Sequence, residues 1–348
     1  MKFIFLVIAF LMSSSYLKAN NKIICDTTYL EYHELINQAE RYYFLNSNVD
    51  SSLAYYDKAF EQYSFIFLKD LVNAAQICVY ERKLKFREYL LKGFKFGLQI
   101  KHLNHFPLLK TLTDDLFSDT SFMEQAILNR KIYLKNINYE YLLKVYDLGI
   151  DDQIKKSQPD EVYAIEKRRN IQKIKGWINK YGFPSSKLIG IDDKDIFKNI
   201  GKPNFDIDNR KYKFSSKIDY YTTEDKSLSN TISMILLIHN QCTFLEFKEI
   251  LYTAMLNGEI HPREIGCLYD NMYRDVNSIF YICKYPDVQN GLFYLNLFCD
   301  YKKFSIDKEK VNNLRSQWNI VEVEVDEKKK QFEEKYGFKL FYGFWKCM

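Results

Sequence analysis

One basic amphipathic stretch, residues 161–181, constrains the fold of this 348-residue chain more than any other part of it. The stretch has the length of a complete helix and runs directly into a Gly-Phe-Pro sequence at 182–184. Gly182 can adopt the left-handed backbone that closes a helix, and Pro184 cannot continue one because it lacks an N–H group. We therefore predict that the helix ends just before Gly182 and that Gly182 has a positive φ. The apolar segment 231–241 has a helical period and is the expected counterpart of this helix.

The balance of bulky residues and turn-formers favours helices over strands. The chain has 28 Tyr and 27 Phe but only 12 Gly and 6 Pro, and folds with many strands need more turns than that supply provides. The aromatic residues follow helical spacing, so we interpret them as helix-packing residues rather than as a stacking surface for sugars or bases. The predicted fold class is mainly α, with N-terminal helical hairpins and a C-terminal helical domain that includes a small β element.

The N-terminus has the pattern of a secretory signal peptide. Lys2 is followed by the apolar run 3–12 and then by small residues. A run of this length is too short to span a bilayer, so we predict a cleaved signal peptide over residues 1–19, with cleavage after Ser15 or Ala19. Further along, no segment approaches the roughly 18 continuous apolar residues of a membrane span. We therefore expect a periplasmic or secreted mature protein without a membrane span.

Cysteine usage and charge narrow the possible cofactors and partners. The seven cysteines are widely spaced and include no C-x-x-C pair, which argues against a zinc site or a thioredoxin-like motif. An oxidising compartment permits one or two disulfides, and the odd number leaves at least one cysteine without an intramolecular partner. The formal net charge of +5 is small for this length, and exported proteins rarely meet nucleic acid. We therefore expect no nucleic-acid partner and no cofactor.

Residues 29–148 follow the pattern of helical hairpins. The segments 70–82 and 86–98 form one predicted pair of helices, and 52–63 belongs to the pair before it. Apolar residues of 52–63 recur at i, i+3, i+6 and i+7, which places them on one helix face. This region resembles tetratricopeptide repeats, whose period is about 34 residues and whose second helix often reads A-x-x-Y-x-K-A. The residues that correspond to that pattern are Leu53, Tyr56, Lys58 and Ala59.

For the rest of the chain we predict a second helical domain at residues 151–320 and, after it, a charged and aromatic tail at residues 321–348. The polar segment 151–161 contains Pro159 and is the predicted boundary between the two halves. Residues 191–230 lack an apolar period and are expected to form a surface insertion. The remaining predicted elements are helices at 244–257, 261–275 and 307–319 and short strands at 278–285 and 291–298.

From Asp151 onward the chain resembles a large bacterial domain family of unknown function. That family shows, in order, D-Q-x-x-R, G-[FW]-P, Q-H and D-R motifs and an Arg in its last helix. The residues that match these motifs are Asp152, Gln153, Gly182, Phe183, Pro184, His239, Asp270 and Arg315. The resemblance covers about half of the chain and rests on the order and spacing of the five motifs.

Three motifs are incomplete in this chain. Their departures are Lys155 and Lys156 near the expected Arg, Ile238 in place of the Gln before the His, and Asn271 in place of the Arg after the Asp. Ile238 removes a polar group and Asn271 removes a fixed charge that the family pattern would supply. The resemblance implies the catalytic candidates His239, Asp270 and Asp152 and the binding candidates Gln153, Arg315 and Tyr181.

His239 has two possible roles. Aliphatic residues precede it at i−7, i−4 and i−3, so it lies on the apolar stripe of its helix. One interpretation is a neutral core histidine that hydrogen-bonds a carbonyl group. The other is a general base, which needs a carboxylate to orient the imidazole, and Asp152 and Asp270 are the candidates for that carboxylate.

Other polar residues give weaker signals. His102 and His105 have the i, i+3 spacing of a helical metal pair, but no acidic residue stands between or beside them, so we predict no metal site. Asp192, Asp193 and Asp195 are expected to be solvated loop charges. The chain has no G-x-S-x-G, H-E-x-x-H, P-loop or G-x-G-x-x-G motif, so common hydrolase, metalloprotease and nucleotide-binding sites lack support.

Two functional hypotheses follow from these patterns. The first is an exported binding protein that holds a protein or peptide of unknown identity on the concave face of its helical repeats. The alternative is a hydrolase-like enzyme of the cell envelope that uses His239 as general base with Asp152 or Asp270. For the N-terminal half, a plain helical bundle whose residues only form a core is a further possibility. Whether the chain is an enzyme depends on what surrounds His239 in the tertiary structure.

Overall fold

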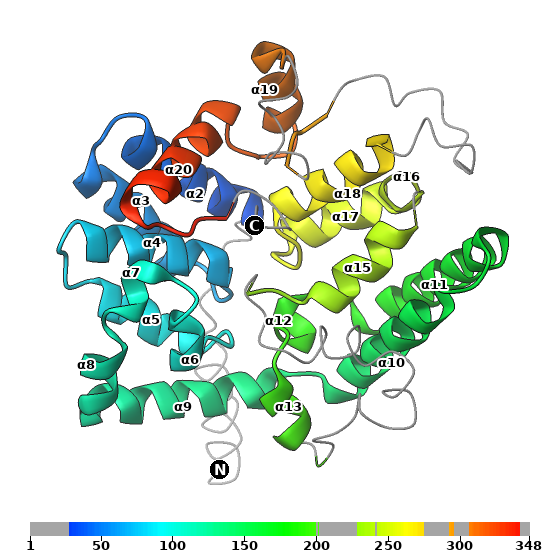
Figure 1. Cartoon of the computed structure of the whole chain (residues 1–348), viewed down its shortest axis with the longest axis horizontal. Coiled ribbons are helices and arrows are strands. Elements are labelled where there is room, and N and C mark those ends of the chain that lie inside the picture. The colour runs from blue at the N-terminus through cyan, green and yellow to red at the C-terminus, as the bar shows by residue number, and fades with distance from the viewer. Residues whose placement is uncertain are drawn as a thin grey trace, which may run out of the picture.

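The computed structural model describes residues 28–199, 201, 228–240, 242–274, 292–295 and 306–341. Helices make up most of this part of the chain, and none of it forms a strand, so the prediction of a mainly α fold is confirmed (Figure 1). The predicted signal peptide and the predicted strand at 278–285 lie outside the described residues. Of the predicted strand at 291–298 only 292–295 are described, and these are irregular. None of the described helices is long and apolar enough to cross a membrane.

The N-terminal half begins with two helical hairpins, as predicted. The first pairs α2 (Tyr29–Phe44) with α3 (Val49–Gln62), and the second pairs α4 (Leu68–Tyr80) with α5 (Phe86–Phe94). Asn48 caps α3, because its side chain accepts a hydrogen bond from the backbone N–H of Ser51 (3.0 Å). The predicted stripe of α3 is buried: Leu53, Tyr56, Ala59 and Phe60.

Five more helices lead from the hairpins towards the second half of the chain. They are α6 (Ile100–Leu103), α7 (Pro107–Lys110), α8 (Thr113–Ser118), α9 (Thr120–Asn136) and α10 (Tyr139–Lys155). The apolar pattern over 122–150 is divided between α9 and α10. The break has a local cause, because the Asn138 side chain accepts a hydrogen bond from the backbone N–H of Tyr141 (3.0 Å) and starts a new helix there.

The basic stretch forms the long helix α11 (Asp160–Tyr181), which follows α10 after a short polar turn and packs against it. Gly182 has φ +94° and ψ 178°, and its N–H donates to the carbonyl oxygen of Ile178 (2.9 Å). Both predictions for this stretch are therefore confirmed: the helix ends before Gly182, and Gly182 has a positive φ.

Replacing Gly182 with alanine should lower the free energy of unfolding by about 1–3 kcal/mol, because a residue with a Cβ is strained in this backbone conformation. Gly176 provides the matched control, since it lies within α11 and an added Cβ would meet no heavy atom within 4 Å. Gly176→Ala should stabilise the protein by roughly 0.5–1 kcal/mol, because alanine loses less backbone entropy in a helix. Urea unfolding of both variants measures these two changes in the free energy of unfolding. Changes of the same sign would contradict the prediction.

The remaining helices surround the second half of the core. They are α12 (Ser186–Ile189), α13 (Lys194–Asn199), α15 (Thr231–His239), α16 (Thr243–Glu246), α17 (Lys248–Leu256), α18 (Pro262–Arg274) and α19 (Lys308–Ser316). Phe247 divides the predicted helix at 244–257 into α16 and α17, and α18 begins at Pro262, where proline needs no N–H partner. Helix α15 packs against α10, α11 and α18 and is almost entirely buried.

Buried apolar side chains form two large clusters. The first consists mainly of residues from α2 to α9, and the second mainly of residues from α10 to α18. The change from the first cluster to the second falls within α9, between Ala126 and Tyr133, rather than at the polar segment 151–161. Helices α10 and α11, on either side of that polar segment, both contribute to the second cluster.

The C-terminal tail returns to the first cluster. Helix α20 (Val323–Tyr336) packs against α2, and the segment after it runs beside α4 (Figure 1). Gln76 of α4 binds both backbone groups of Lys339: its Nε2 donates to the carbonyl oxygen (2.9 Å), and its Oε1 accepts from the N–H (2.8 Å). Phe338, Leu340 and Phe341 are buried in the same cluster. The chain therefore covers its own N-terminal hairpins.

Candidate functional site

His239 and Asp152 meet in the folded chain although 87 positions separate them. His239 is the last residue of α15, and Asp152 lies in the last turn of α10. Their Nδ1 and Oδ2 atoms are 2.6 Å apart. The Asp152 side chain is 1% exposed and that of His239 is 17% exposed. A buried carboxylate therefore holds the imidazole, which stays partly open to solvent.

Three further side chains hold the Asp152 carboxylate. Asn170 Nδ2 donates to Oδ1 (3.1 Å), and Gln153 Nε2 donates to Oδ2 (3.2 Å). The hydroxyl of Tyr163 also donates to Oδ2 (3.2 Å) and lies 3.0 Å from Nδ1 of His239. A carboxylate can accept several such bonds at once, and together they fix its position.

Helical periodicity explains why α11 supplies two of these partners. Tyr163 and Asn170 are seven residues apart, which is close to two turns, so they lie on the same face of α11. That face packs against α10, where Asp152 lies, and against α15, which ends at His239. The site is thus built at the meeting point of three helices from the second core cluster.

The contacts determine which nitrogen of His239 can act as a base. A carboxylate oxygen only accepts hydrogen bonds, so we assign the imidazole proton to Nδ1, which faces Asp152. Nε2 then carries a lone pair and can accept a proton from water or from a hydroxyl group. When it does so, Asp152 stabilises the imidazolium that forms.

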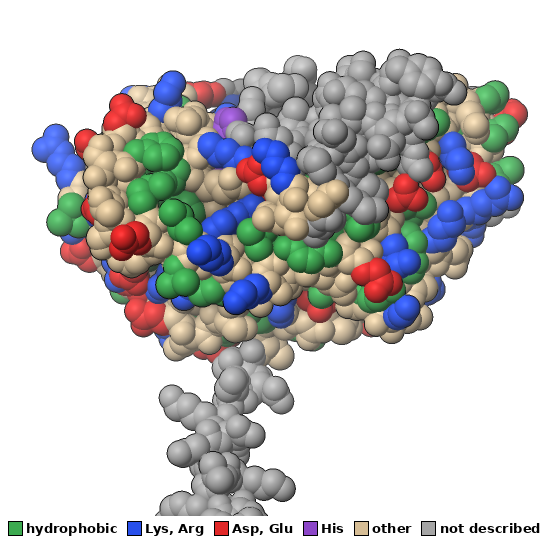
Figure 2. All heavy atoms as spheres, turned by 90° about the horizontal axis from the view of Figure 1, so that it is seen from below, with side chains coloured by type: hydrophobic (Ala, Val, Ile, Leu, Met, Phe, Trp, Pro, Cys, Tyr) green, Lys and Arg blue, Asp and Glu red, His purple; other side chains and the backbone are tan. Residues whose placement is uncertain are grey.

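Charged side chains of α10 and α11 lie near Tyr163 and Glu166. Lys167 lies over the ring of Tyr163, with Nζ 5.1 Å from its centroid. Glu166 binds both Lys155 (2.6 Å) and Arg169 (2.7 Å), and these two hydrogen-bonded partners lower the pKa of Glu166. Lys and Arg side chains also spread over the lower face of the molecule, including the end where α11 lies (Figure 2). Of these cations, Lys167 is the one in contact with a residue of the His239 site, Tyr163.

The other two charged candidates, Asp270 and Arg315, hold an irregular segment in place. Asp270 accepts hydrogen bonds from the backbone N–H groups of Phe293 (2.7 Å) and Leu295 (2.6 Å). Arg315 Nε donates to the carbonyl oxygen of Phe293 (2.8 Å). Both side chains are 0% exposed. Of the two carboxylates considered as partners of His239, the structure places Asp152 beside it and directs Asp270 towards residues 293–295.

The two remaining binding candidates lie in different surroundings. Gln153 belongs to the His239 site, because its Nε2 is 3.5 Å from Nδ1 of His239 as well as bonded to Asp152. Tyr181 lies at the far end of α11, where its hydroxyl donates to Glu140 (2.7 Å) and its ring stacks on Tyr141 with centroids 4.8 Å apart. Tyr181 therefore attaches α11 to α10 rather than contributing to the same site.

The prediction that Asp192 and Asp193 are solvated loop charges is wrong, because both are buried, at 1% and 2% exposure. Asp192 accepts hydrogen bonds from the hydroxyl of Tyr146 (2.7 Å) and the backbone N–H of Thr231 (2.9 Å). Asp193 binds Arg130 and Gln99. The two carboxylates join the start of α15 and the region of α9 to the 191–199 segment, so this part of the predicted surface insertion is internal. Residues 202–227 lie outside the described residues.

His102 and His105 do not form a metal pair with acidic neighbours. His102 is 0% exposed, and its Nδ1 accepts a hydrogen bond from the backbone N–H of Gln99 (3.3 Å), which caps α6. In the described part of the chain, no group of three or more His, Cys, Asp or Glu side chains is placed to hold a metal ion.

Sequence reasoning missed Tyr163 and Asn170. Both are buried, and Asn170 lies directly before Ile171 on the inward face of α11. A polar residue beside the apolar stripe of an otherwise exposed basic helix was the available signal, because buried amides need a hydrogen-bond partner. The identity of that partner depended on the packing of α10 against α11.

The fold and the site together define a class: a mainly α protein in which a buried carboxylate orients a partly exposed histidine at the junction of three helices. No protein-family model matches the chain, and comparisons with curated proteins and with solved structures likewise gave no match. Function must therefore be argued from the geometry of the site.

Proposed function

We propose that the protein is a hydrolase-like enzyme in which His239 is the general base and Asp152 orients it. The contact of 2.6 Å between His239 Nδ1 and Asp152 Oδ2 carries this proposal, because it leaves Nε2 as the proton acceptor. The hydrogen bonds from Asn170, Gln153 and Tyr163 support it, since they hold the carboxylate in one position.

The proposed reaction uses water as the nucleophile. A water molecule at Nε2 of His239 loses a proton to the imidazole while its oxygen attacks a carbonyl or phosphoryl centre of the substrate. The imidazolium, stabilised by Asp152, then returns the proton to the leaving group. The proposed substrate class is an ester with a negative charge near the scissile bond, because Lys167 lies over the ring of Tyr163, whose hydroxyl contacts both His239 and Asp152.

The test is turnover of a panel of carboxylic and phosphoric esters, each supplied as an anionic and a neutral form. We expect hydrolysis of at least one anionic member, and a rate lower by about 10²–10⁴-fold in His239→Gln and Asp152→Asn, the usual contribution of a positioned general base. Asp151→Asn, which removes the neighbouring carboxylate of α10, should keep the parent rate. An unchanged rate in His239→Gln, or no turnover across the panel, would contradict the proposal.

Chemical modification of His239 provides a second test. Diethyl pyrocarbonate acylates accessible neutral imidazole nitrogens, and His239 is partly exposed whereas His33 and His102 are 1% and 0% exposed. Peptide mapping after brief treatment should therefore find His239 modified well before the other two. Hydrolysis of the panel ester should be lost in parallel with this modification.

We propose protein or peptide binding by the helical hairpins as a second function. The observation in its favour is the segment at 337–341, which lies along α4 with both backbone groups of Lys339 bound by Gln76. Backbone recognition of this kind does not depend on the identity of the bound side chains. A partner peptide would have to take the place of the chain's own tail, so a substitution that loosens α20 tests this function.

We also propose that the mature protein is periplasmic or secreted and that residues 151–320 belong to the domain family they resemble. The signal-peptide pattern over residues 1–19 supports export. Cys242 is disulfide-bonded, and disulfides persist mainly in oxidising compartments. Cys78 is buried and forms no disulfide.

A further inference from the structure

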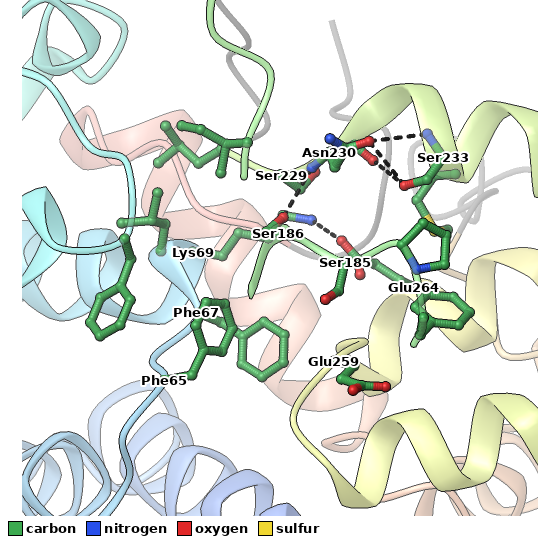
Figure 3. Close-up of a pocket in the computed structure, with 17 residues that line it drawn as sticks. Phe65, Phe67, Lys69, Ser185, Ser186, Ser229, Asn230, Ser233, Glu259 and Glu264 are labelled. Carbon is green, nitrogen blue, oxygen red and sulfur yellow. Dashed lines mark hydrogen bonds and ion pairs between the residues drawn. The ribbon is translucent and has the colours of Figure 1, made fainter. Parts of the chain in front are cut away.

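The cavity between the two apolar clusters is too small for an organic ligand. Phe67, Ser185 and Ser229 are among the residues that line it (Figure 3). Its volume of about 30 Å³ holds one or two water molecules. A larger partner therefore cannot bind in this cavity.

Helix α9 has apolar residues on two faces. Phe122, Ala126 and Tyr133 are buried and pack into the protein. Ile127 and Leu128 point away from them, at 52% and 59% exposure. A surface helix needs only one apolar face, and its opposite face is normally polar. Helix α9 lies along the lower edge of the molecule in Figure 1, and Figure 2 shows hydrophobic side chains gathered at the end where α8 and α9 lie. An exposed apolar face of this kind indicates an interaction surface.

The charges of this exposed face are divided along the helix. Glu124 lies towards the N-terminal end of α9, and Lys131 and Lys135 lie towards its C-terminal end. Spacings of seven and four residues place all three on one side of the helix. Within the described residues, none of the three forms an ion pair. Lys131 and Lys135 are about one turn apart and repel each other, so a partner with a carboxylate at this end of α9 would offset the repulsion.

The exposed face is complementary to a second copy of itself. In an antiparallel pair of α9 helices with Ile127 opposite Leu128 of the partner subunit, positions equally far from the centre face each other. Glu124 is three positions before Ile127, and Lys131 is three positions after Leu128. Each Glu124 therefore faces Lys131 of the partner subunit, and two-fold symmetry forms this pair twice. A parallel pair would instead place like charges opposite each other.

We propose that the protein forms a two-fold symmetric dimer through α9, with a second copy of this chain as the partner. Association removes Ile127, Leu128 and Ile132 of both copies from water, and the charge pairs fix the antiparallel direction. An interface built from one helix per subunit is small, so we expect a dissociation constant in roughly the micromolar range. This inference does not depend on the chemistry proposed for His239, because that site lies on α10, α11 and α15.

Sedimentation velocity of the full chain between about 1 and 200 µM tests self-association. We expect a monomer at the low end of this range and a dimer at the high end. Ile127→Glu should weaken the dimer by at least about tenfold, because it places a carboxylate in the apolar interface. Ile165→Glu is the matched control and should leave the dimer unchanged, because Ile165 is a similarly exposed isoleucine (56%) on α11. A monomer at every concentration, or equal weakening by the two variants, would overturn the proposal.

Charge reversal tests the antiparallel register. Glu124→Lys and Lys131→Glu should each weaken the dimer by about tenfold, because like charges then face each other twice in every dimer. The double variant restores opposite charges in exchanged positions, so its dissociation constant should return to within about threefold of the parent value. A double variant no tighter than the single variants would contradict the pairing of Glu124 with Lys131. Binding of a monomeric chain to anionic lipid vesicles, lost in Ile127→Glu, would assign this face to a membrane surface and also overturn the proposal.

Discussion

Replacing Asp326 with asparagine should lower the free energy of unfolding by about 3–5 kcal/mol, because the buried guanidinium group of Arg315 loses its carboxylate and that of Arg263 keeps only Glu40. Asp326 is 0% exposed and lies between Arg263 and Arg315. Its Oδ1 is 2.8 Å from Nη2 of Arg263, and its Oδ2 accepts a hydrogen bond from Nη1 of Arg315 (2.8 Å). Burial alone would raise the pKa of Asp326, but the three cations Arg263, Arg315 and Lys329 outweigh it and hold the pKa below its ordinary value.

Glu327→Gln is the matched control for this substitution, since Glu327 is the next residue on α20 and also forms an ion pair. Its carboxylate lies 2.7 Å from Nζ of Lys308, but the two side chains are 21% and 43% exposed. Solvent screens such a pair, so its loss should change stability by no more than about 1 kcal/mol. Urea unfolding of both variants at neutral pH measures the difference. Equal changes would show that the contacts of Asp326 with Arg263 and Arg315 contribute no more than an exposed ion pair.

The Asp326→Asn variant also tests peptide binding by the helical hairpins. Asp326 attaches α20 to α18 and α19, so its substitution should loosen α20 and the segment after it. A labelled peptide with the sequence of residues 323–341 should then bind Asp326→Asn at a lower concentration than it binds the parent protein. Adding Gln76→Ala to the variant should weaken this binding, because the amide that holds Lys339 is lost. Peptide binding that is no stronger in Asp326→Asn than in the parent would contradict the binding proposal.

A second large change in the free energy of unfolding is expected when the pH is lowered. His33 and His261 are buried, at 1% and 8% exposure, and their rings meet edge to face with centroids 5.2 Å apart. Burial lowers the pKa of both histidines well below the ordinary value, and their mutual repulsion lowers that of His33 further. Asp70 and Glu264 act in the opposite direction on His33 and His261 respectively, but they do not outweigh burial.

The sign of the acid effect follows from proton uptake. As pH falls through about 6.5, the unfolded chain binds a proton at each of these two histidines while the folded chain does not, so stability is lost. Two such groups should lower the free energy of unfolding by about 2–3 kcal/mol between pH 7.5 and 5.5. The pKa of Asp70 is raised, with burial as the main cause, so proton uptake by the folded state at Asp70 acts against this loss.

The substitution His33→Leu tests whether His33 and His261 cause this pH dependence of stability. It removes one of the two protons, so the loss between pH 7.5 and 5.5 should fall by about half. It should not destabilise the protein at pH 7.5, because neither ring nitrogen of His33 has a hydrogen-bond partner in the described part of the chain. Urea unfolding at several pH values tests both statements, with His105→Gln as the control. A pH dependence in His33→Leu equal to that of the parent would exclude His33 as its source.

Features with local causes could be predicted from the sequence. The end of α11 at Gly182, the start of α18 at Pro262 and the two N-terminal hairpins depend on backbone conformation or on spacing within one helix. His239 and Asp152 were also recognised as candidates from the motif pattern. Their contact could not be distinguished from a contact with Asp270, because both carboxylates are far from His239 along the chain.

Other features depend on packing between segments that are distant in the sequence. Asp192 and Asp193 follow a short apolar run and resemble loop charges, but they are buried because Tyr146, Thr231 and Arg130 surround them. The aromatic run in the tail after residue 320 is visible in the sequence. The sequence does not indicate that this tail packs against α2 and α4.

The sequence by itself therefore determined the helical class, the helix ends and the inward faces, since these follow from steric limits and periodicity over a few residues. Only the tertiary structure decided that Asp152 rather than Asp270 touches His239, and that the tail covers the hairpins. These outcomes depend on which faces meet, and every buried charge then needs a partner supplied by another segment.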